Sequence, residues 1–432
     1  MQKNELYPVI CEDITNQGYG IVHIDSMTAF VFGLLPGEKA KIRILKVLSR
    51  YAFGKIEERY TFSAHRQEPV CPAFGKCGGC AFLHMEYSAS LKVKQDYVQS
   101  LFDRAHLPIK VEFPFFPQDP YAYRNKAQFP VQVKEGKVQM GFYRPHSHDV
   151  INCPKCMIQS DAINHVYQTI RQKIQPEAAA GLRHVLIRSN RNNKIQIVWI
   201  GSENRFQTLS QELVATLPQI VSIVFNKNTR KDNVILGETY EVLYGTDFLV
   251  QECRGLQMDV HFKSFYQVNP VMMEVLYQTA IDLADLQDFM HVVDLYSGTG
   301  TISCLVSRHV QSVIGVEIVE EAVQDAKRNA LRNHLDNVEF VCEDAGVYAR
   351  KHAQKTDVLF VDPPRKGLSI EATEHIQSFD PDKIIYISCN PNTLVRDAKR
   401  LQEAGYACQR VQPVDMFCQT AGLECVSLFV KR

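Results

Sequence analysis

The chain has 432 residues, of which 45% are hydrophobic and 22% are charged, the balance of an ordinary globular protein. Its 48 basic and 48 acidic residues cancel, so any charge signal for a nucleic-acid partner must be local. The first residues lack the apolar core of a signal peptide, and no run approaches the ~18 apolar residues of a membrane span. We therefore expect a cytoplasmic protein of about three domains, with no membrane partner and with its 13 cysteines reduced.

Residues 1–60 are expected to form a small β-barrel, because short strands such as MTAFVFG and KIRILKV are separated by Gly and Pro turns. Within KIRILKV, Lys41 and Arg43 alternate with Ile42 and Ile44, so one face is charged and the other packs. Tyr51 and Phe53 lie among the basic residues of 39–59, and basic groups interleaved with aromatic ones suit a phosphate backbone with stackable bases. A solvated strand face with core aromatics is the alternative interpretation.

Residues 61–245 are expected to form a central α+β domain with a cysteine-rich loop, one helix (SASLKVKQDYVQSLFDRA) and several hairpins. The clearest hairpin is RHVLIRSNRNNKIQIVWI, in which residues 190–193 supply the turn between two alternating runs. Residues 246–432 alternate apolar strands such as HVVDL, SVIGVE and KIIYIS with helical stretches such as EEAVQDAKRNALRN. This alternation predicts an α/β fold with a parallel, doubly wound sheet.

The segment VVDLYSGTGTISCLVSR, residues 292–308, is typical of a strand, a glycine turn and a helix. Gly298 and Gly300 let the backbone approach a ligand, toward which the helix points its first N–H groups. Glu317 ends the next strand, where a carboxylate can accept hydrogen bonds from ribose hydroxyls, and Asp344 is expected on the adenine side. Without a complete dinucleotide motif to hold a pyrophosphate, a nucleoside cofactor such as S-adenosylmethionine fits best.

Three further segments, VDPPRKG, SCNPN and AGLECV, are expected at the carboxyl ends of strands, where open α/β sheets bind their ligands. They bring Asp362, Cys389 and Glu424 together beside a methyl donor. Addition of a thiolate to carbon 6 of a pyrimidine lets carbon 5 accept a methyl group, after which a carboxylate removes the carbon 5 proton. Cys389 is the candidate nucleophile and Glu424 is the candidate general base.

The segment EPVCPAFGKCGGCAFLHM places Cys71, Cys77 and Cys80 close together in the chain. Clustered cysteines in a reduced compartment are typical of metal ligands rather than disulfides. A fourth ligand can come from NCPKC, which contains Cys153 and Cys156. Four thiolates bind either zinc or an iron–sulfur cluster, and the spacing does not separate these two.

Taken together, the motifs SFYQVNP (264–270), DLYSGTGT (294–301), DPPRKG (362–367), SCNP (388–391) and LECVSL resemble those of the RNA uridine-5-methyltransferases. These enzymes act on ribosomal and transfer RNA. Residues 1–60 resemble the TRAM domain, an OB-like RNA-binding barrel. The segment CPAFGKCGGCAFLH resembles the four-iron, four-sulfur loop of the ribosomal RNA members. The resemblance covers essentially the whole chain.

This resemblance implies a C-terminal Rossmann-like class I methyltransferase domain, an N-terminal TRAM barrel and a central α+β domain that carries an iron–sulfur loop. It implies that S-adenosylmethionine is held by Gln267, Tyr296, Glu317 and Asp362. It implies that Cys389 is the nucleophile and that Glu424 is the base. It also implies a [4Fe–4S] cluster with the ligands Cys71, Cys77, Cys80 and Cys156. Cys153 is then an extra cysteine that does not bind the cluster.

We therefore expect S-adenosylmethionine-dependent methylation of carbon 5 of a uridine in RNA. The expected substrate is 23S ribosomal RNA, with the target base flipped out of a single-stranded loop. No obligate protein partner is inferred. Three alternatives stay open: a methyltransferase for transfer RNA, a redox or radical iron–sulfur enzyme that modifies RNA, and a non-catalytic RNA chaperone that keeps this fold.

Overall fold

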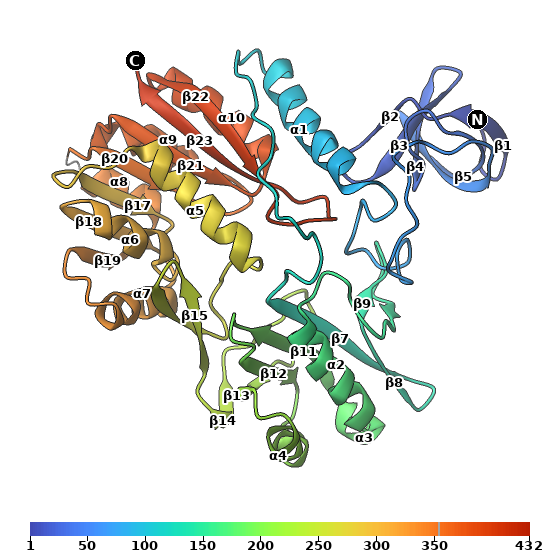
Figure 1. Ribbon diagram of the computed structural model, residues 1–432, viewed down its shortest axis with the longest axis horizontal. Coiled ribbons are helices and arrows are strands. Elements are labelled where there is room, and N and C mark those ends of the chain that lie inside the picture. The colour runs from blue at the N-terminus through green and yellow to red at the C-terminus, as the bar shows by residue number, and fades with distance from the viewer. Residues whose placement is uncertain (353–354) are drawn as a thin grey trace.

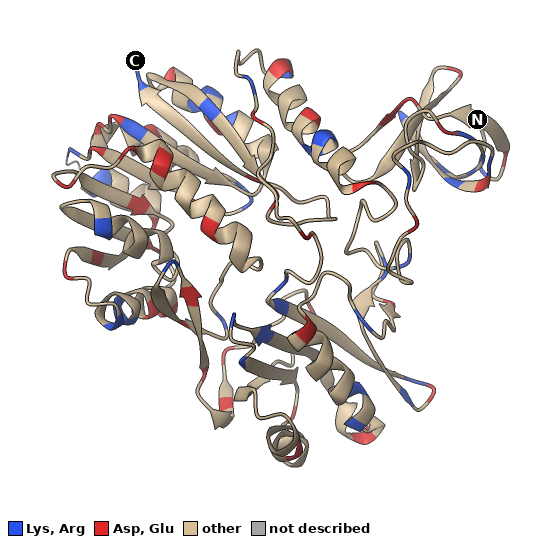
Figure 2. Cartoon of the chain, in the orientation of Figure 1, with Lys and Arg blue, Asp and Glu red and all other residues tan. Residues whose placement is uncertain are grey.

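A computed structural model describes residues 1–352 and 355–432 of the chain. Figure 1 shows a small β lobe around the N-terminus, a mixed lobe in the middle of the chain, and a larger α/β lobe that contains the C-terminus. Basic and acidic residues are interspersed over all of these lobes, as the balanced composition implies (Figure 2). Among the described residues, no helix combines the length and the hydropathy that crossing a membrane requires.

The N-terminal lobe is a six-stranded, barrel-like sheet in the order β1-β5-β6-β4-β3-β2 (Figure 1). The side chains of Ala40, Ile42 and Ile44 are fully buried, whereas the basic side chains between them are not. The predicted alternation of a packed and a charged face is therefore confirmed. The strands are β1 (Leu6–Ile10), β2 (Asp13–Ile14), β3 (Tyr19–Ile24), β4 (Met27–Phe32), β5 (Lys39–Val47) and β6 (Tyr51–Arg59).

The central lobe is built on a second six-stranded sheet, in the order β14-β13-β12-β11-β7-β8. The predicted hairpin is confirmed, since β11 and β12 pair antiparallel around a turn in which Asn193 has a φ of 56°. Trp199 is fully buried and donates from Nε1 to Ser210 Oγ of α4 at 3.0 Å. The elements are β7 (Lys126–Lys134), β8 (Lys137–Met140), β9 (Phe142–Tyr143), β10 (Val150–Ile151), α2 (Asp161–Lys173), α3 (Pro176–Ala179), β11 (Leu182–Ser189), β12 (Ile195–Gly201), α4 (Gln207–Thr216), β13 (Ile220–Lys227) and β14 (Tyr240–Gly245).

The helix α1 (Tyr87–Arg104) packs on the C-terminal lobe, although it precedes the central sheet in the chain. Its Val98 and Phe102 share a hydrophobic cluster with Leu394 and Leu401 of α10. Figure 1 shows α1 beside the C-terminal sheet and between it and the N-terminal lobe. A segment that precedes the central sheet in the chain is therefore part of the C-terminal lobe.

The C-terminal lobe contains a seven-stranded sheet in the order β19-β18-β17-β20-β21-β23-β22. The first five strands of this order are parallel, which confirms the predicted α/β fold, and β23 runs antiparallel to both β21 and β22. Helices α5, α6 and α7 cover one face, and α8 and α10, with α1, cover the other. The elements are β15 (Phe248–Cys253), β16 (Leu256–His261), α5 (Pro270–Ala284), β17 (His291–Leu295), α6 (Thr301–Val306), η1 (Ser307–His309), β18 (Ser312–Glu317), α7 (Glu320–Arg332), β19 (Val338–Cys342), α8 (Ala345–Lys351), β20 (Val358–Val361), α9 (Ile370–His375), η2 (Ile376–Phe379), β21 (Lys383–Ser388), α10 (Pro391–Glu403), β22 (Tyr406–Val414) and β23 (Glu424–Lys431).

Candidate active site

The glycine loop between β17 and α6 lies at the carboxyl edge of the sheet, as predicted. Gly300 has a φ of +79°, and a Cβ atom there would lie 2.6 Å from Phe340 Cζ, so only glycine fits. Gly298 N donates to Glu317 Oε2 at 3.0 Å, which brings the carboxylate at the end of β18 against the loop. Val319 N donates to the other oxygen of Glu317 at 2.9 Å. The orientation of this carboxylate is therefore set by two backbone N–H groups.

Three buried polar atoms on the segment 264–270, on β17 and on the glycine loop have no hydrogen-bond partner within the described part of the chain. They are Gln267 Oε1, Asp294 Oδ1 and Ser297 Oγ. Buried polar atoms are normally paired, so such atoms indicate a place for a polar ligand. Asp294 accepts from Ser303 Oγ at 2.5 Å with its second oxygen. Burial raises the pKa of Asp294 to about 7. The donor and acceptor set thus fits a nucleoside cofactor.

Two other residues expected at the cofactor lie at the same edge of the sheet. Tyr296 follows β17 directly and has a left-handed φ of 68°. Asp344 follows β19, and its Oδ1 caps α8 by accepting from Gly346 N at 2.9 Å and from Val347 N at 3.2 Å, so its place on the adenine side stays a prediction. An aspartate that precedes a helix satisfies the unpaired N–H groups of the first turn. Its position after β19 therefore has a structural explanation.

The three predicted catalytic residues meet at this edge as well. Asp362 follows β20 and Cys389 follows β21, as expected for the carboxyl ends of parallel strands. Glu424 departs from the prediction, because it begins β23, and β23 runs antiparallel to β21. The amino end of an antiparallel strand lies beside the carboxyl ends of its neighbours. The carboxyl group of Glu424 therefore reaches the same place by the opposite chain direction.

All three acidic groups have pKa values above their ordinary range. Burial raises the pKa of the Cys389 thiol to about 11, with further contributions from Glu424 and Asp362. Burial and then Asp362 raise the pKa of Glu424 well above its usual value, while Arg365 opposes the shift at both Glu424 and Cys389. Burial, followed by Asp294, raises the pKa of Asp362 to about 7. Mutually perturbed groups of this kind are typical of functional sites.

A cavity of about 120 Å³ lies beside the Cys389 thiol, and residues from three distant parts of the chain line it. Asn16 comes from the N-terminal lobe, and Lys94 and Tyr97 come from α1. Tyr97 Oη accepts from Asn392 Nδ2 at 2.7 Å. None of these three residues was predicted from the sequence to lie at the site. The one signal for Lys94 was a lysine at helical spacing from the apolar Leu91 and Val98, where a hydrophobic residue is expected.

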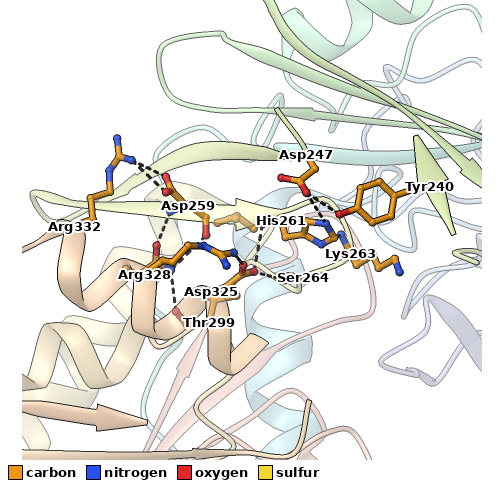
Figure 3. Close-up of polar contacts among 12 residues, drawn as sticks. Tyr240, Asp247, Asp259, His261, Lys263, Ser264, Thr299, Asp325, Arg328 and Arg332 are labelled. Atoms are coloured by element: carbon orange, nitrogen blue, oxygen red, sulfur yellow. Dashed lines mark hydrogen bonds and ion pairs between the residues drawn. The ribbon is translucent and has the colours of Figure 1, made fainter. Parts of the chain in front are cut away.

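Helix α7 connects the cofactor loops to the hairpin β15–β16, as Figure 3 shows. Asp325 Oδ2 accepts from Ser264 Oγ at 2.5 Å, at the start of the segment that carries Gln267. Asn329 accepts from Asp259 N at 2.7 Å and donates to the carbonyl of Thr299, in the glycine loop, at 3.1 Å. Buried side-chain networks with satisfied partners rigidify their surroundings. One face of α7 therefore positions both segments.

The cysteine loop faces the central sheet across a cavity of about 380 Å³. All four predicted ligands line this cavity, as does Cys153, and none of these thiols is in a disulfide. Cys153 Sγ donates to Lys155 O at 2.9 Å. Among residues 1–352 and 355–432, no group of three or more His, Cys, Asp or Glu side chains stands in a metal-binding arrangement. The four thiols share one cavity, and the cluster that they are expected to hold stays a prediction.

Two family models match this chain. The model described as tRNA (Uracil-5-)-methyltransferase matches residues 86–432, and the TRAM domain model matches residues 2–56. The chain belongs to the tRNA (uracil-5-)-methyltransferase family. The predicted enzyme class and the predicted TRAM domain are thereby confirmed. Family membership also argues against the non-catalytic chaperone as the primary interpretation.

Relatives match almost the whole chain. A protein of Bacillus cereus named an uncharacterized RNA methyltransferase is 36% identical in an alignment of 447 positions, which covers 99% of this chain and 97% of that protein. A Clostridium tetani protein of the same name is 37% identical with the same coverage. The crystal structure of Pyrococcus abyssi tRNA (uracil-54, C5)-methyltransferase with S-adenosyl-L-homocysteine has a TM-score of 0.77 and 21% identity, and covers 98% of this chain and 99% of its own. This similarity shows the fold and confirms the Rossmann-like architecture.

Proposed function

We propose that this chain methylates carbon 5 of a uridine in RNA, with Cys389 bonding transiently to carbon 6 of the base. The observation that carries the proposal is the placement of Cys389 and Glu424 side by side, at the ends of the paired strands β21 and β23. A thiol and a buried carboxyl group beside a glycine loop are the groups that this chemistry needs. Asp362 is close enough to both to raise their pKa values.

S-adenosylmethionine is the proposed methyl donor, and it supplies an electrophilic methyl group when bound. The proposed contacts are Gln267, Tyr296, Glu317 and Asp362. The unpartnered Gln267 Oε1 supports a polar ligand, and so does the glycine loop. Glu317 accepts one backbone N–H on each oxygen, which leaves lone pairs for ribose hydroxyls.

The proposed chemistry of the chain's own residues has two parts. Cys389 first gives its proton to solvent, an ionisation that the positive charge of Arg365 favours, and the thiolate then attacks carbon 6. Carbon 5 thereby gains electron density and accepts the methyl group. Glu424 then takes the proton from carbon 5, the double bond between carbons 5 and 6 forms again, and the thiolate leaves. A raised pKa makes the ionised Glu424 a stronger base for this step.

The proposed substrate is 23S ribosomal RNA, with a uridine flipped from a single-stranded loop. This choice rests on the likeness of the cysteine loop to that of the ribosomal RNA members. We also propose that a [4Fe–4S] cluster is held by Cys71, Cys77, Cys80 and Cys156, because all four line one cavity. The cluster is proposed to be structural, since nothing in the reaction requires an electron. Either RNA substrate suits the cytoplasmic location expected from the sequence.

Methylation of a transfer RNA uridine is the second candidate function. It is favoured by the description of the matching family and by the name of the Pyrococcus abyssi enzyme, which both specify transfer RNA. Mass-spectrometric mapping of 5-methyluridine in ribosomal and transfer RNA, from cells with and without this gene, separates the two. Loss of a 23S modification supports the first candidate, and loss of a tRNA modification supports the second.

The covalent mechanism is tested with purified protein and a uridine-containing RNA. Cys389→Ala is expected to abolish both product and adduct, whereas Glu424→Gln is expected to accumulate the covalent RNA adduct, because the proton on carbon 5 is not removed. Methylation by Cys389→Ala would overturn the covalent mechanism. Normal turnover by Glu424→Gln would overturn the assignment of the base. Full dependence of activity on a reductant would favour the redox alternative.

A further inference from the structure

The segment 415–423, called the base loop here, joins β22 to β23 and leads directly into Glu424. It contains turns and no regular secondary structure. Turn segments do not have the internal hydrogen-bond ladder that holds a helix or a strand in place. The position of Glu424 at the start of β23 therefore depends on the contacts that the rest of the protein makes with the base loop.

Lys94 of α1 makes three of these contacts with one ammonium group. Its Nζ donates to Asp415 Oδ1 at 2.5 Å, to the carbonyl of Phe417 at 3.2 Å and to the carbonyl of Gly422 at 2.9 Å. The side chains of Lys94 and Asp415 are 1% and 0% exposed. Lys94 thus joins the two ends of the base loop, and its contact at Gly422 lies two residues before Glu424.

Several other groups also hold the base loop in place. Tyr87, also on α1, donates from Oη to Asp415 Oδ2 at 2.7 Å, so the carboxylate is paired on both oxygens. Other contacts are Asn269 Nδ2 to the carbonyl of Met416 at 3.2 Å, Tyr123 Oη to the carbonyl of Cys418 at 3.0 Å, the N–H groups of Ala81 and Phe82 to the carbonyl of Gln419 at 2.8 and 3.1 Å, and Asp415 N to the carbonyl of Phe115 at 2.7 Å. Tyr87 also interacts with the Cys418 thiol, whereas Lys94 contacts residues at both ends of the base loop.

The ammonium group of Lys94 has three N–H donors and three acceptors, so its hydrogen-bonding capacity is used up. It has no donor left over for substrate, which argues against a role as an acid or base. Burying an ion pair is stabilising only when its geometry is excellent, and hydrophobic residues of similar volume often serve stability equally well. A buried lysine aimed at a catalytic segment is therefore better explained by the geometry that it imposes than by stability.

We propose that Lys94 is a positioning residue that closes the base loop and so sets Glu424 for removal of the carbon 5 proton. This inference rests on the proposed function, because it takes Glu424 to be the base. It assigns to α1 a role in the second half of the reaction. Attack by Cys389 comes before removal of the proton and does not use Glu424, although Ala421, Gly422 and Leu423 of the base loop also line the cavity beside Cys389.

Two RNA substrates separate the two halves of the reaction. RNA that contains 5-fluorouridine traps the methylated adduct, because fluorine cannot leave as a cation, so its trapping rate reports attack and methyl transfer without Glu424. RNA that contains uridine reports complete turnover. For Lys94→Met we expect trapping within about two-fold of the unaltered protein, turnover lower by about 10²-fold, and accumulation of the covalent adduct with uridine RNA. The exposed Lys92→Met, on the same helix, is the matched control and is expected to change neither rate.

Lys94→Met leaves Asp415 without its cation, so Lys94→Met/Asp415→Asn is measured as well, since it removes both charges together. Tyr87→Phe removes the hydrogen bond to Asp415 and the hydroxyl beside Cys418 but keeps both charges, and it is expected to change the ratio of turnover to trapping by a smaller factor than Lys94→Met. If circular dichroism shows that Lys94→Met and Lys94→Met/Asp415→Asn do not fold, the proposal is tested with Tyr87→Phe alone. In that case, a ratio of turnover to trapping that is unchanged in Tyr87→Phe would overturn the proposal.

A parallel fall of trapping and turnover in a folded Lys94 variant would also overturn the proposal, because it would show general loosening of the site. Unchanged turnover would overturn it too. Failure of the proposed function is a different result, seen with other variants. It appears as methylation by Cys389→Ala or as normal turnover by Glu424→Gln, whatever the Lys94 variants do.

Discussion

Cys389 and Glu424 leave neighbouring strands at adjacent positions, because Ser388 of β21 and Cys425 of β23 are register partners. Cys389 follows Ser388, and Glu424 precedes Cys425. The thiol and the carboxyl group therefore lie at the same end of the strand pair. The two groups are 35 positions apart in the chain and are brought together by a single antiparallel pairing. A proposed nucleophile and a proposed base thus share one short piece of sheet.

The ligand-free protein is expected to be stabilised at alkaline pH by Asp362→Asn. The folded-state pKa of Asp362 is about 7, above the value of about 3.9 for an exposed aspartate, so the folded state is favoured while the carboxyl keeps its proton. That advantage is lost as the pH rises to about 7. The melting temperature of Asp362→Asn should therefore exceed that of the unaltered protein by an amount that grows from pH 5 to about pH 7 and then levels off.

Scanning fluorimetry of the ligand-free protein over this pH range measures the difference. The exposed Asp382→Asn provides a control for the loss of one negative charge. A melting-temperature difference for Asp362→Asn that does not vary with pH would contradict the raised pKa.

Gly300→Ala should destabilise the protein much more than Gly298→Ala. Both glycines have positive φ, of 79° and 55°, so both substitutions carry a backbone penalty of about 1–2 kcal/mol. Only at Gly300 would the added methyl group also clash, with Phe340 Cζ and Ala326 Cβ, since nothing lies within 4 Å of a Cβ atom at Gly298. Denaturant unfolding of the ligand-free variants compares the two, and equal losses would be inconsistent with the packing described.

Asn329→Ala should weaken S-adenosylmethionine binding and lower stability by about 1–3 kcal/mol, because Asp259 N and the carbonyl of Thr299 lose a buried partner. Loss of the bond to Thr299 frees the glycine loop. Calorimetric titration with the cofactor and thermal unfolding measure the two effects. Lys327→Ala, on the exposed side of the same helix, should leave both unchanged. Full cofactor affinity in Asn329→Ala would rule out this role for α7.

Cys156→Ser should lower the iron content of anaerobically purified protein, whereas Cys153→Ser should leave it near the level of the unaltered protein. Asn164 holds Cys156 at both ends of its backbone, accepting from N at 3.0 Å and donating to O at 2.9 Å, which suits a fixed ligand. The Cys153 thiol lies beside Cys71 and donates to the carbonyl of Lys155 at 2.9 Å. Iron and sulfide assays decide. Loss of iron in Cys153→Ser but not in Cys156→Ser would make Cys153 the fourth ligand. Absence of iron from the unaltered protein and from both variants would refute the cluster.

Much of the fold was predictable because local sequence patterns determine local structure. The turn at residues 190–193 and the alternation in KIRILKV predicted a hairpin and a two-faced strand, and both are present. The glycine loop and the strand end at Glu317 were predictable for the same reason. The direction of β23 was not, because an apolar strand has the same pattern whether it pairs parallel or antiparallel.

The sequence by itself determined the types of elements, their order, and the residues able to do chemistry, among them Cys389, Glu424 and the clustered cysteines. Only the tertiary structure decided which of these residues meet. It inserts β23 between β21 and β22, and it brings Lys94 to Asp415, 321 positions away in the chain. The physical reason is that hydrophobic periodicity records which side of a helix or strand is buried, but not what it is buried against. A lysine on an apolar face looks like an exception until its three acceptors are seen.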